Sequence, residues 1–275
     1  EDSVSGLNQG DSDFKIDIAV IYLPHISNFT DFDLLSSEPE TRVRYVRDLQ
    51  QVGNPDVIII PGSKNTIEDL EYLYQNDFDK IIKNKKSRGI PVIGICGGYQ
   101  MLGEKISDPL KIESEKGTIK GLGLLDIETI MNGDKTTRQV TGKITGDISF
   151  FKDLNGEIVS GYEIHQGVTE VNKKTKSILD IFKNNHKDET DAEGSVSDGV
   201  ISKDGLVWGT YLHGIFDNDK FRRVFINFLR ERKGLSPLTK KQISARAKRE
   251  EAYNKLADLL QNNLSMSKLN HILFN

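Results

Sequence analysis

Cysteine is scarce in this sequence, because Cys96 is the single one among 275 residues. That scarcity excludes a disulfide framework and a multi-cysteine metal site, since each needs several cysteines. The histidine, aspartate and glutamate residues show no zinc-site spacing either, so we expect no metal. Long apolar runs are also lacking, as no segment approaches the roughly 18 residues of a membrane span. We therefore expect a cytoplasmic protein without a membrane partner.

An excess of positive charge is lacking as well. The formal net charge is −4, whereas nucleic-acid-binding surfaces are usually basic, so we expect no nucleic-acid partner. The chain does not start with methionine, and its acidic, polar segment 1–13 is unlike a signal peptide. We interpret 1–13 as a linker that followed an upstream region, 14–237 as one domain and 238–275 as a helical extension.

Apolar runs in the first half of the chain alternate with a helical pattern. The runs Lys15 to Leu23, Asp56 to Ile60 and Pro91 to Ile95 are typical of strands buried on both faces. Between the second and third runs, Thr66 to Lys86 has the apolar spacing of an amphipathic helix, with Thr66 as its expected N-cap. This order predicts a βαβ unit, and therefore an α/β fold with a mainly parallel sheet flanked by helices.

The second half of the chain has a different pattern. Short alternating stretches from Gly121 to Val171 predict antiparallel additions to the sheet, and the polar stretch Asn184 to Asp198 predicts a surface loop. Gly205 to Leu212 is expected to form a further strand. Two helices are expected after it, over Phe221 to Arg232 and Gln242 to Leu260.

The segment Gly94 to Gln100, with the sequence GICGGYQ, has the layout of a nucleophile elbow. A buried strand leads into a sharp turn that needs small neighbours, because the nucleophile sits in a strained conformation. Cys96 would then lie at a helix N-terminus, where the helix dipole favours an anion. The backbone N–H of Gly97 could donate to an oxyanion. A lone buried cysteine is more often structural, so the assignment needs further support.

Two other segments supply that support. Gly62 and Ser63 follow the strand that precedes the elbow, so the Gly62 N–H is a candidate second oxyanion donor. His213 ends the predicted strand Gly205 to Leu212. Carboxyl ends of parallel strands share one sheet edge, so Cys96 and His213 can meet there as nucleophile and base.

Four motifs in this order resemble the glutaminase domain of the cobyric acid synthase family. They are PGSKNT at 61–66, GICGGYQ at 94–100, YEIHQG at 162–167 and YLHGIF at 211–216. The segment Ile26 to Asp33 is also similar to that family. The resemblance spans roughly Ile16 to Pro237 and implies a flavodoxin-like, class I glutamine amidotransferase fold.

What the resemblance implies is a thiol glutaminase. Cys96 and His213 would hydrolyse glutamine and supply ammonia for ATP-dependent amidation of corrinoid carboxylates in cobalamin biosynthesis. In the family, ATP and magnesium belong to an N-terminal synthetase domain, the expected partner of this one. The sequence contains no Gly-x-x-x-x-Gly-Lys-Ser/Thr motif, so we expect this domain itself to bind no cofactor.

Several residues near the motifs have open roles. Many class I amidotransferases carry a glutamate two residues after the catalytic histidine, whereas this sequence has Ile215 there. Glu163 is a candidate for the missing orienting acid, with a structural carboxylate as the alternative. His165 is expected either to line the pocket or to be structural. Gln100 and Ser63 could bind substrate, although Gln100 could equally cap the elbow helix.

Three alternatives stay open at this level. The chain could belong to a related amidotransferase, either the a,c-diamide synthase or an enzyme that amidates a lipid precursor. It could instead be a cysteine hydrolase of the same architecture. Release of ammonia from free glutamine would distinguish a glutaminase from such a hydrolase. The absent acid at position 215 also leaves a non-catalytic partner-binding domain as a possibility.

Overall fold

The computed structural model describes residues 14–172, 175–182, 195–239, 244–265, 268–269 and 271–272. The expected linker 1–13 and most of the expected loop after Asn184 lie outside this described part. The described residues divide into two units, one ending at Leu238 and one beginning at Thr239. The α/β class expected from the sequence is confirmed in the first unit.

The first unit is built on one large sheet whose strands change direction halfway across. Its parallel half runs in the order β3 (Thr41–Val46), β1 (Ile16–Ile21), β4 (Val57–Ile60), β6 (Val92–Ile95) and β13 (Val207–Thr210). The sheet continues with β12 (Val196–Ile201), β11 (Ser177–Ile181), β9 (Ile127–Ile144), β7 (Lys105–Ser107) and β8 (Thr118–Lys120), and β10 (Ile158–Val171) pairs with β9. A separate small pair joins β2 (Ile26–Ser27) to β5 (Gly62–Ser63).

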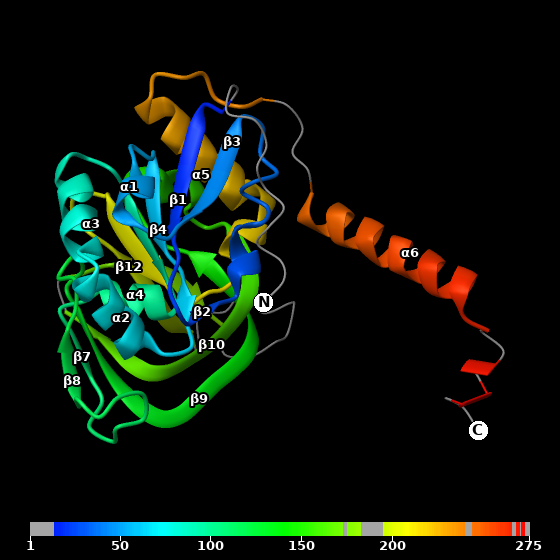
Figure 1. The fold of residues 1–275 in the computed structure, drawn as a ribbon. Coiled ribbons are helices and arrows are strands. Elements are labelled where there is room, and N and C mark those ends of the chain that lie inside the picture. Colours follow the sequence, from blue (N-terminus) through cyan, green and yellow to red (C-terminus); the bar gives the residue numbers. More distant parts are fainter. Residues whose placement is uncertain are drawn as a thin grey trace. The chain divides into compact units, whose positions relative to one another are not determined.

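Helices cover both faces of the parallel strands. They are α1 (Leu49–Val52), α2 (Thr66–Gln75), α3 (Phe78–Ser87), α4 (Gly97–Leu102) and α5 (Asp219–Arg232), with short 3-10 turns η1 (Phe29–Phe32), η2 (Ser149–Leu154) and η3 (Ile215–Asp217). Figure 1 shows α2 and α3 on one side and α5 on the other. Buried strands need cover on both faces, because the residues of β4, β6 and β13 are all buried.

The helix expected over Thr66 to Lys86 is two helices rather than one. The backbone of Asp77 has a φ of 59°, a left-handed conformation that aspartate tolerates, and it separates α2 from α3. The N-cap of α2 is Asn65, whose side chain accepts the backbone N–H of Glu68. The expectation of Thr66 as N-cap is therefore wrong by one residue.

The antiparallel additions are confirmed, but they are longer than the sequence indicated. The strands β9 and β10 form one ribbon, whose register shifts at a bulge between Gln166 and Val168. Figure 1 shows this ribbon curving past the end of the sheet where β2 lies. The end of the expected loop is in fact strand β12, in which the carboxylate of Asp198 is buried and accepts the backbone N–H of Tyr211 at 3.2 Å.

An aromatic cluster fixes α5 against the sheet. The indole of Trp208, on β13, lies 5.3 Å from the ring of Phe151 and 5.9 Å from that of Phe221, measured between centroids. Edge-to-face contacts of this kind stabilise buried aromatic residues beyond their burial alone. The packing holds β13 and α5 together, and the turn between them carries His213.

The second unit contains α6 (Ala245–Asn263), where a helix was expected over Gln242 to Leu260. The side chain of Ser244 accepts the backbone N–H of Ala247, and this cap sets the start of the helix. Residues 240–243 lie outside the described part. The stripe of α6 that includes Leu256 and Leu259 is exposed.

Candidate active site

Cys96 lies in the sharp turn between β6 and α4, as the elbow motif predicted. Its backbone has φ 53° and ψ −112°, a strained combination for a residue with a side chain. The turn holds because the Cys96 N–H donates to Thr210 O at 2.9 Å and the Gln100 N–H donates to Cys96 O at 3.1 Å. The Cys96 thiol donates to Ile164 O on β10 at 3.3 Å.

The glycines of the elbow are required by close packing. A Cβ added to Gly98 would lie 2.0 Å from Ile60 O, and one added to Gly94 would lie 2.5 Å from Gly98 O. No side chain fits at such distances, so α4 can pack directly on β4 and β6 only with glycine here. The motif is therefore explained by the approach of two backbones.

The two proposed oxyanion glycines border the same space. A Cβ added to Gly62 would lie 3.2 Å from Cε1 of His213, and one added to Gly97 would lie 3.1 Å from the backbone nitrogen of Ser63. The structure thus brings β5, the start of α4 and His213 together. Whether the N–H groups of Gly62 and Gly97 stabilise an oxyanion stays a prediction.

His213 is fully buried and its imidazole is held by a carboxylate from the other end of the chain. Nδ1 of His213 lies 2.7 Å from Oδ2 of Asp31, and the Gly214 N–H donates to Oδ1 of Asp31 at 3.1 Å. Asp31 belongs to η1. His213, the predicted base, therefore has a carboxylate partner, although position 215 is isoleucine.

Glu163, a candidate for the orienting acid, has the structural role that the sequence left as the alternative. Oε2 of Glu163 instead accepts from Nε of Arg138 at 2.6 Å, across the β9/β10 ribbon. Sequence reasoning missed Asp31, which is 182 residues away from His213. One signal could have found it: Asp31 follows the first strand, so it belongs to the same sheet edge as Cys96 and His213.

Tyr162 and Asn28 complete the surroundings of the imidazole. The Tyr162 ring stacks on the His213 ring with centroids 5.1 Å apart, and their backbones form an isolated bridge. The hydroxyl of Tyr162 donates to Oδ1 of Asp31 at 3.4 Å. Nδ2 of Asn28, a residue in the left-handed conformation, lies 3.2 Å from Nε2 of His213.

These neighbours determine the charge of His213. Burial of the imidazole lowers its pKa, but hydrogen bonds and charge interactions with Asp31 and Cys96 outweigh burial and raise the pKa to about 10. An imidazole with this pKa carries a proton at neutral pH. His165 differs, because burial lowers its pKa and favours the neutral ring.

The segment that carries Asp31 is clasped to α5 by buried charges. The guanidinium of Arg222 donates through Nε to Oε1 of Glu38 at 2.8 Å and through Nη1 to Phe216 O at 2.8 Å. Nη2 of Arg223 donates to Oε2 of Glu38 at 2.9 Å. This clasp of Glu38, Arg222 and Arg223 joins the segment that carries the acid to the segment that follows the base.

A cavity of about 360 Å³ opens at Cys96. It is bordered by β10 on one side and by β2, β5, the start of α2 and α4 on the other. The side chains that line it are Ser27, Asn28, Ser63, Lys64, Thr66, Cys96, Gln100, Glu113, Lys135, Ile164, His165 and Gln166. Pockets that join a few polar groups to a reactive side chain are the usual place for a substrate.

Three expected pocket residues lie in this cavity, each with a visible structural contact. The amide of Gln100 donates to Gln166 O and to the Tyr211 hydroxyl, both at 2.9 Å. The hydroxyl of Ser63 donates to Oδ2 of Asp69 at 2.6 Å. The ring of His165 stacks on Tyr211 with centroids 3.9 Å apart, and its buried Nδ1 has no hydrogen-bond partner among the described residues.

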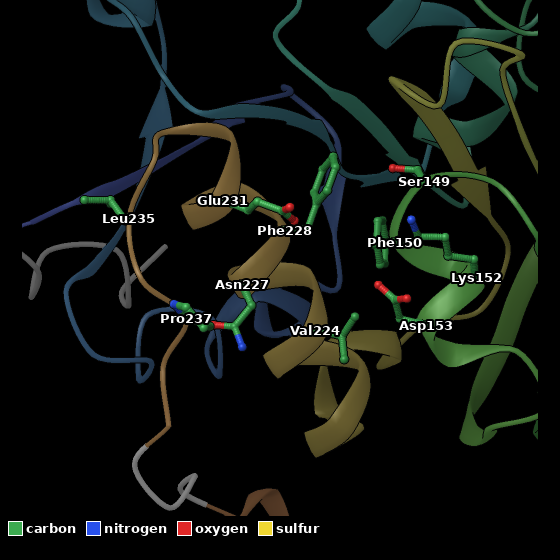
Figure 2. A pocket seen from close by; sticks show the side chains of 10 residues that line it. All are labelled: Ser149, Phe150, Lys152, Asp153, Val224, Asn227, Phe228, Glu231, Leu235 and Pro237. Atoms are coloured by element: carbon green, nitrogen blue, oxygen red, sulfur yellow. The ribbon is translucent and has the colours of Figure 1, made fainter.

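A second, larger cavity of about 570 Å³ lies between η2 and α5 (Figure 2). Phe150, Val224 and Phe228 give it an apolar wall, and Lys152 and Asp153 lie at its border. Ser149 and Glu231 also line it, but neither Cys96 nor His213, the predicted nucleophile and base, belongs to it. The Cys96 cavity is therefore the candidate active site.

Neither a metal cluster nor a membrane helix occurs in the part of the chain that the structure describes. No group of three or more histidine, cysteine, aspartate or glutamate residues there could hold a metal ion. No helix there is long and apolar enough to cross a membrane.

Comparison with known proteins identifies the family of the chain. Residues 17–221 match the family described as the CobB/CobQ-like glutamine amidotransferase domain. The chain is 43% identical to a cobyric acid synthase from Caldanaerobacter subterraneus subsp. tengcongensis, over 94% of this chain and 50% of that protein. It is 46% identical to a cobyric acid synthase from Listeria innocua, over 99% of this chain and 51% of that protein. The chain thus spans about half the length of these relatives.

A solved structure shares the fold. A chain from the structure of PurLQS from Thermotoga maritima aligns with a TM-score of 0.60 at 20% identity, and the match covers 78% of this chain and 100% of that one. At this identity the likeness concerns the fold alone.

Proposed function

The chain belongs to the CobB/CobQ-like glutamine amidotransferase family, and from this premise we propose that it is the glutaminase part of a cobyric acid synthase. The observation that carries the proposal is the buried pair of His213 and Asp31, 2.7 Å apart, together with Cys96 in a strained turn that opens into a cavity. The names of the relatives that match nearly all of this chain support the corrinoid pathway.

The proposed reaction passes through a thioester. His213 already holds the proton of Cys96 as an imidazolium, and the thiolate sulfur attacks the side-chain amide carbon of glutamine. The N–H groups of Gly62 and Gly97 stabilise the tetrahedral oxyanion. The C–N bond then breaks, and His213 gives its proton to the leaving nitrogen, so that ammonia leaves. Neutral His213 next takes a proton from water, the resulting hydroxide attacks the thioester, the C–S bond breaks, and glutamate leaves as the thiolate of Cys96 and the imidazolium of His213 are restored.

Asp31 holds His213 in place during both steps. A carboxylate on Nδ1 fixes the tautomer in which Nε2 exchanges protons with sulfur and substrate. The absent acid at position 215 was the reason to consider a non-catalytic binding domain. Asp31 supplies that acid from another segment, and this favours the catalytic alternative.

The partner and the second half-reaction are part of the proposal. The relatives are about twice the length of this chain, and we place ATP and magnesium on the portion that this chain lacks. That portion would activate a corrinoid carboxylate, and ammonia from Cys96 would amidate it.

The test is release of glutamate and ammonia from glutamine, with and without the synthetase part. We expect Cys96→Ala to abolish hydrolysis, because no other thiol exists in the chain. Ser87→Ala, an exposed serine at the end of α3 that does not line the Cys96 cavity, is the control and should retain activity. Persistence of hydrolysis in Cys96→Ala, or no hydrolysis by the wild type under either condition, would overturn the proposal.

A further inference from the structure

Glu113 places a negative charge in the cavity of Cys96. The residue is half-buried, and its Oε2 accepts the backbone N–H groups of Thr66 at 2.7 Å and Ile67 at 3.2 Å. No hydrogen-bond partner of Oε1 exists among the described residues. One oxygen therefore anchors the carboxylate, and the other can receive a ligand.

The loop that carries Glu113 is fixed by a buried acid. The carboxylate of Asp108 accepts the backbone N–H groups of Ile112, Glu113 and Ser114 at 2.8, 2.8 and 3.0 Å. Asp108 is fully buried. The direction in which Glu113 enters the cavity is thus built into the fold, as a binding group requires.

Among the residues that the structure describes, no lysine, arginine or histidine forms an ion pair with the carboxylate of Glu113. Burial and the nearby Asp108 and Asp69 raise the pKa of Glu113, although two backbone N–H groups oppose the shift. A positively charged ligand would offset the free-energy cost of ionising this carboxylate, because a nearby opposite charge favours the ionised form. Lys64 and Lys135 line the same cavity, so a zwitterion entering it meets charges of both signs.

Gln100 and Thr66 lie between Cys96 and Glu113 in the lining of the cavity. Gln100 lies four residues after Cys96, the N-cap of α4, which corresponds to about 6 Å of helical rise. Oε1 of Gln100 then accepts from Oγ1 of Thr66 at 3.2 Å, and the backbone of Thr66 contacts Glu113. In glutamine the amide carbon and the α-nitrogen are separated by four bonds, roughly 5 Å when extended. Because Cys96 and Glu113 line the same cavity, a glutamine with its amide at Cys96 can extend its α-nitrogen to the Glu113 side.

We propose that the carboxylate of Glu113 binds the α-ammonium group of glutamine and so selects free glutamine over amides without that charge. This assignment rests on the proposed glutaminase function. A purely structural Glu113 would only anchor its loop to α2.

The test compares glutamine with glutaramate, which is glutamine without its α-amino group. Glu113→Gln keeps an oxygen for the Thr66 and Ile67 N–H groups and removes the charge alone. We expect kcat/KM for glutamine to fall about 10- to 100-fold, mainly through KM, because a charge-assisted hydrogen bond is lost. The value for glutaramate should change less than about twofold.

The control is Glu115→Gln, an acid of the same loop that is exposed and pairs with Lys111 at 2.6 Å. It should leave both substrates unaffected. Equal losses for glutamine and glutaramate in Glu113→Gln, or no loss for either, would assign Glu113 a structural role and overturn the inference.

A binding measurement tests this inference independently of the proposed hydrolysis. In the Cys96→Ser background, which removes the thiol, calorimetry measures affinity for both ligands without turnover. Glu113→Gln should weaken the affinity for glutamine by about 10- to 100-fold and leave the affinity for glutaramate unchanged. This holds even if the wild type hydrolyses nothing. Failure of the Cys96→Ser chain to bind glutamine would overturn the assignment as well.

Discussion

The charge on the His213 imidazole depends on its two neighbours. Because the folded pKa is raised to about 10, the folded state binds a proton that the unfolded state releases above its ordinary pKa of about 6.5. The resulting contribution to stability is complete below about pH 6.5 and is lost as the pH rises towards 10.

Asp31→Asn should lower the pKa of His213, because the carboxylate on Nδ1 is replaced by a neutral amide. Titration of the His213 ring protons by NMR measures the change directly. If glutamine is hydrolysed, kcat should fall about 10²- to 10⁴-fold, the range for a positioned acid or base.

Asp33→Asn is the matched control for Asp31→Asn, since it removes an exposed carboxylate from the same segment. It should leave the pKa of His213 close to that of the wild type. An unchanged His213 titration in Asp31→Asn would contradict the role given to Asp31.

At the scale of elements, the site depends on how closely α4 packs on the sheet. Gly98→Ala places a methyl group 2.0 Å from Ile60 O, so the helix must shift. We expect the free energy of unfolding to fall by about 1–3 kcal/mol or more, as in overpacked cores. Gly133→Ala is the control, because nothing lies within 4 Å of the added Cβ there. Denaturant titration that gives equal values for both variants would contradict this.

The clasp of Glu38, Arg222 and Arg223 gives a second prediction at this scale. Arg222→Met leaves the carboxylate of Glu38 buried with less compensation, and we expect a loss of about 3–5 kcal/mol in the free energy of unfolding. Lys220 lies on the same helix as Arg222 and forms an exposed ion pair with Glu157. Lys220→Ala breaks that pair and should lower the free energy of unfolding by at most about 1 kcal/mol. Thermal or urea unfolding measures both, and a similar small loss for each would show that the clasp is not stabilising.

The elements also show what the sequence could and could not predict. Continuous β-branched runs predicted β1, β4 and β6 because burial on both faces needs such residues. The break between α2 and α3 was missed because it depends on a left-handed Asp77 within an otherwise periodic pattern. In the candidate site, local motifs in the sequence predicted the positions of Cys96 and His213. Asp31 was missed because its contact with His213 is tertiary and has no local spacing.

At the scale of the whole molecule, the buried core belongs to the first unit. Among the described residues, every buried hydrophobic side chain lies before position 239. Trp208, the single tryptophan, is part of this core, so its fluorescence reports unfolding of that unit.

A chain ending at Leu238 should unfold in one transition whose midpoint differs by less than about 2 °C from that of the full chain, since it keeps every buried hydrophobic side chain among the described residues. Fluorescence of Trp208 during heating measures this. A midpoint lowered by more than about 5 °C would mean that residues 239–275 stabilise the first unit.

The position of β13 has a consequence for folding. This strand is among the last in the sequence, yet it lies in the middle of the sheet, between β6 and β12. The sheet is incomplete until β13 pairs with β6, which lies more than 100 residues earlier in the sequence. Contacts between residues so far apart in the sequence slow folding. His213 follows β13 by three residues, so its position depends on the pairing of that strand. A compact state that forms before β13 pairs therefore cannot hold His213, the proposed base, beside Cys96. Catalytic competence should therefore return during refolding together with the complete sheet, and never ahead of it.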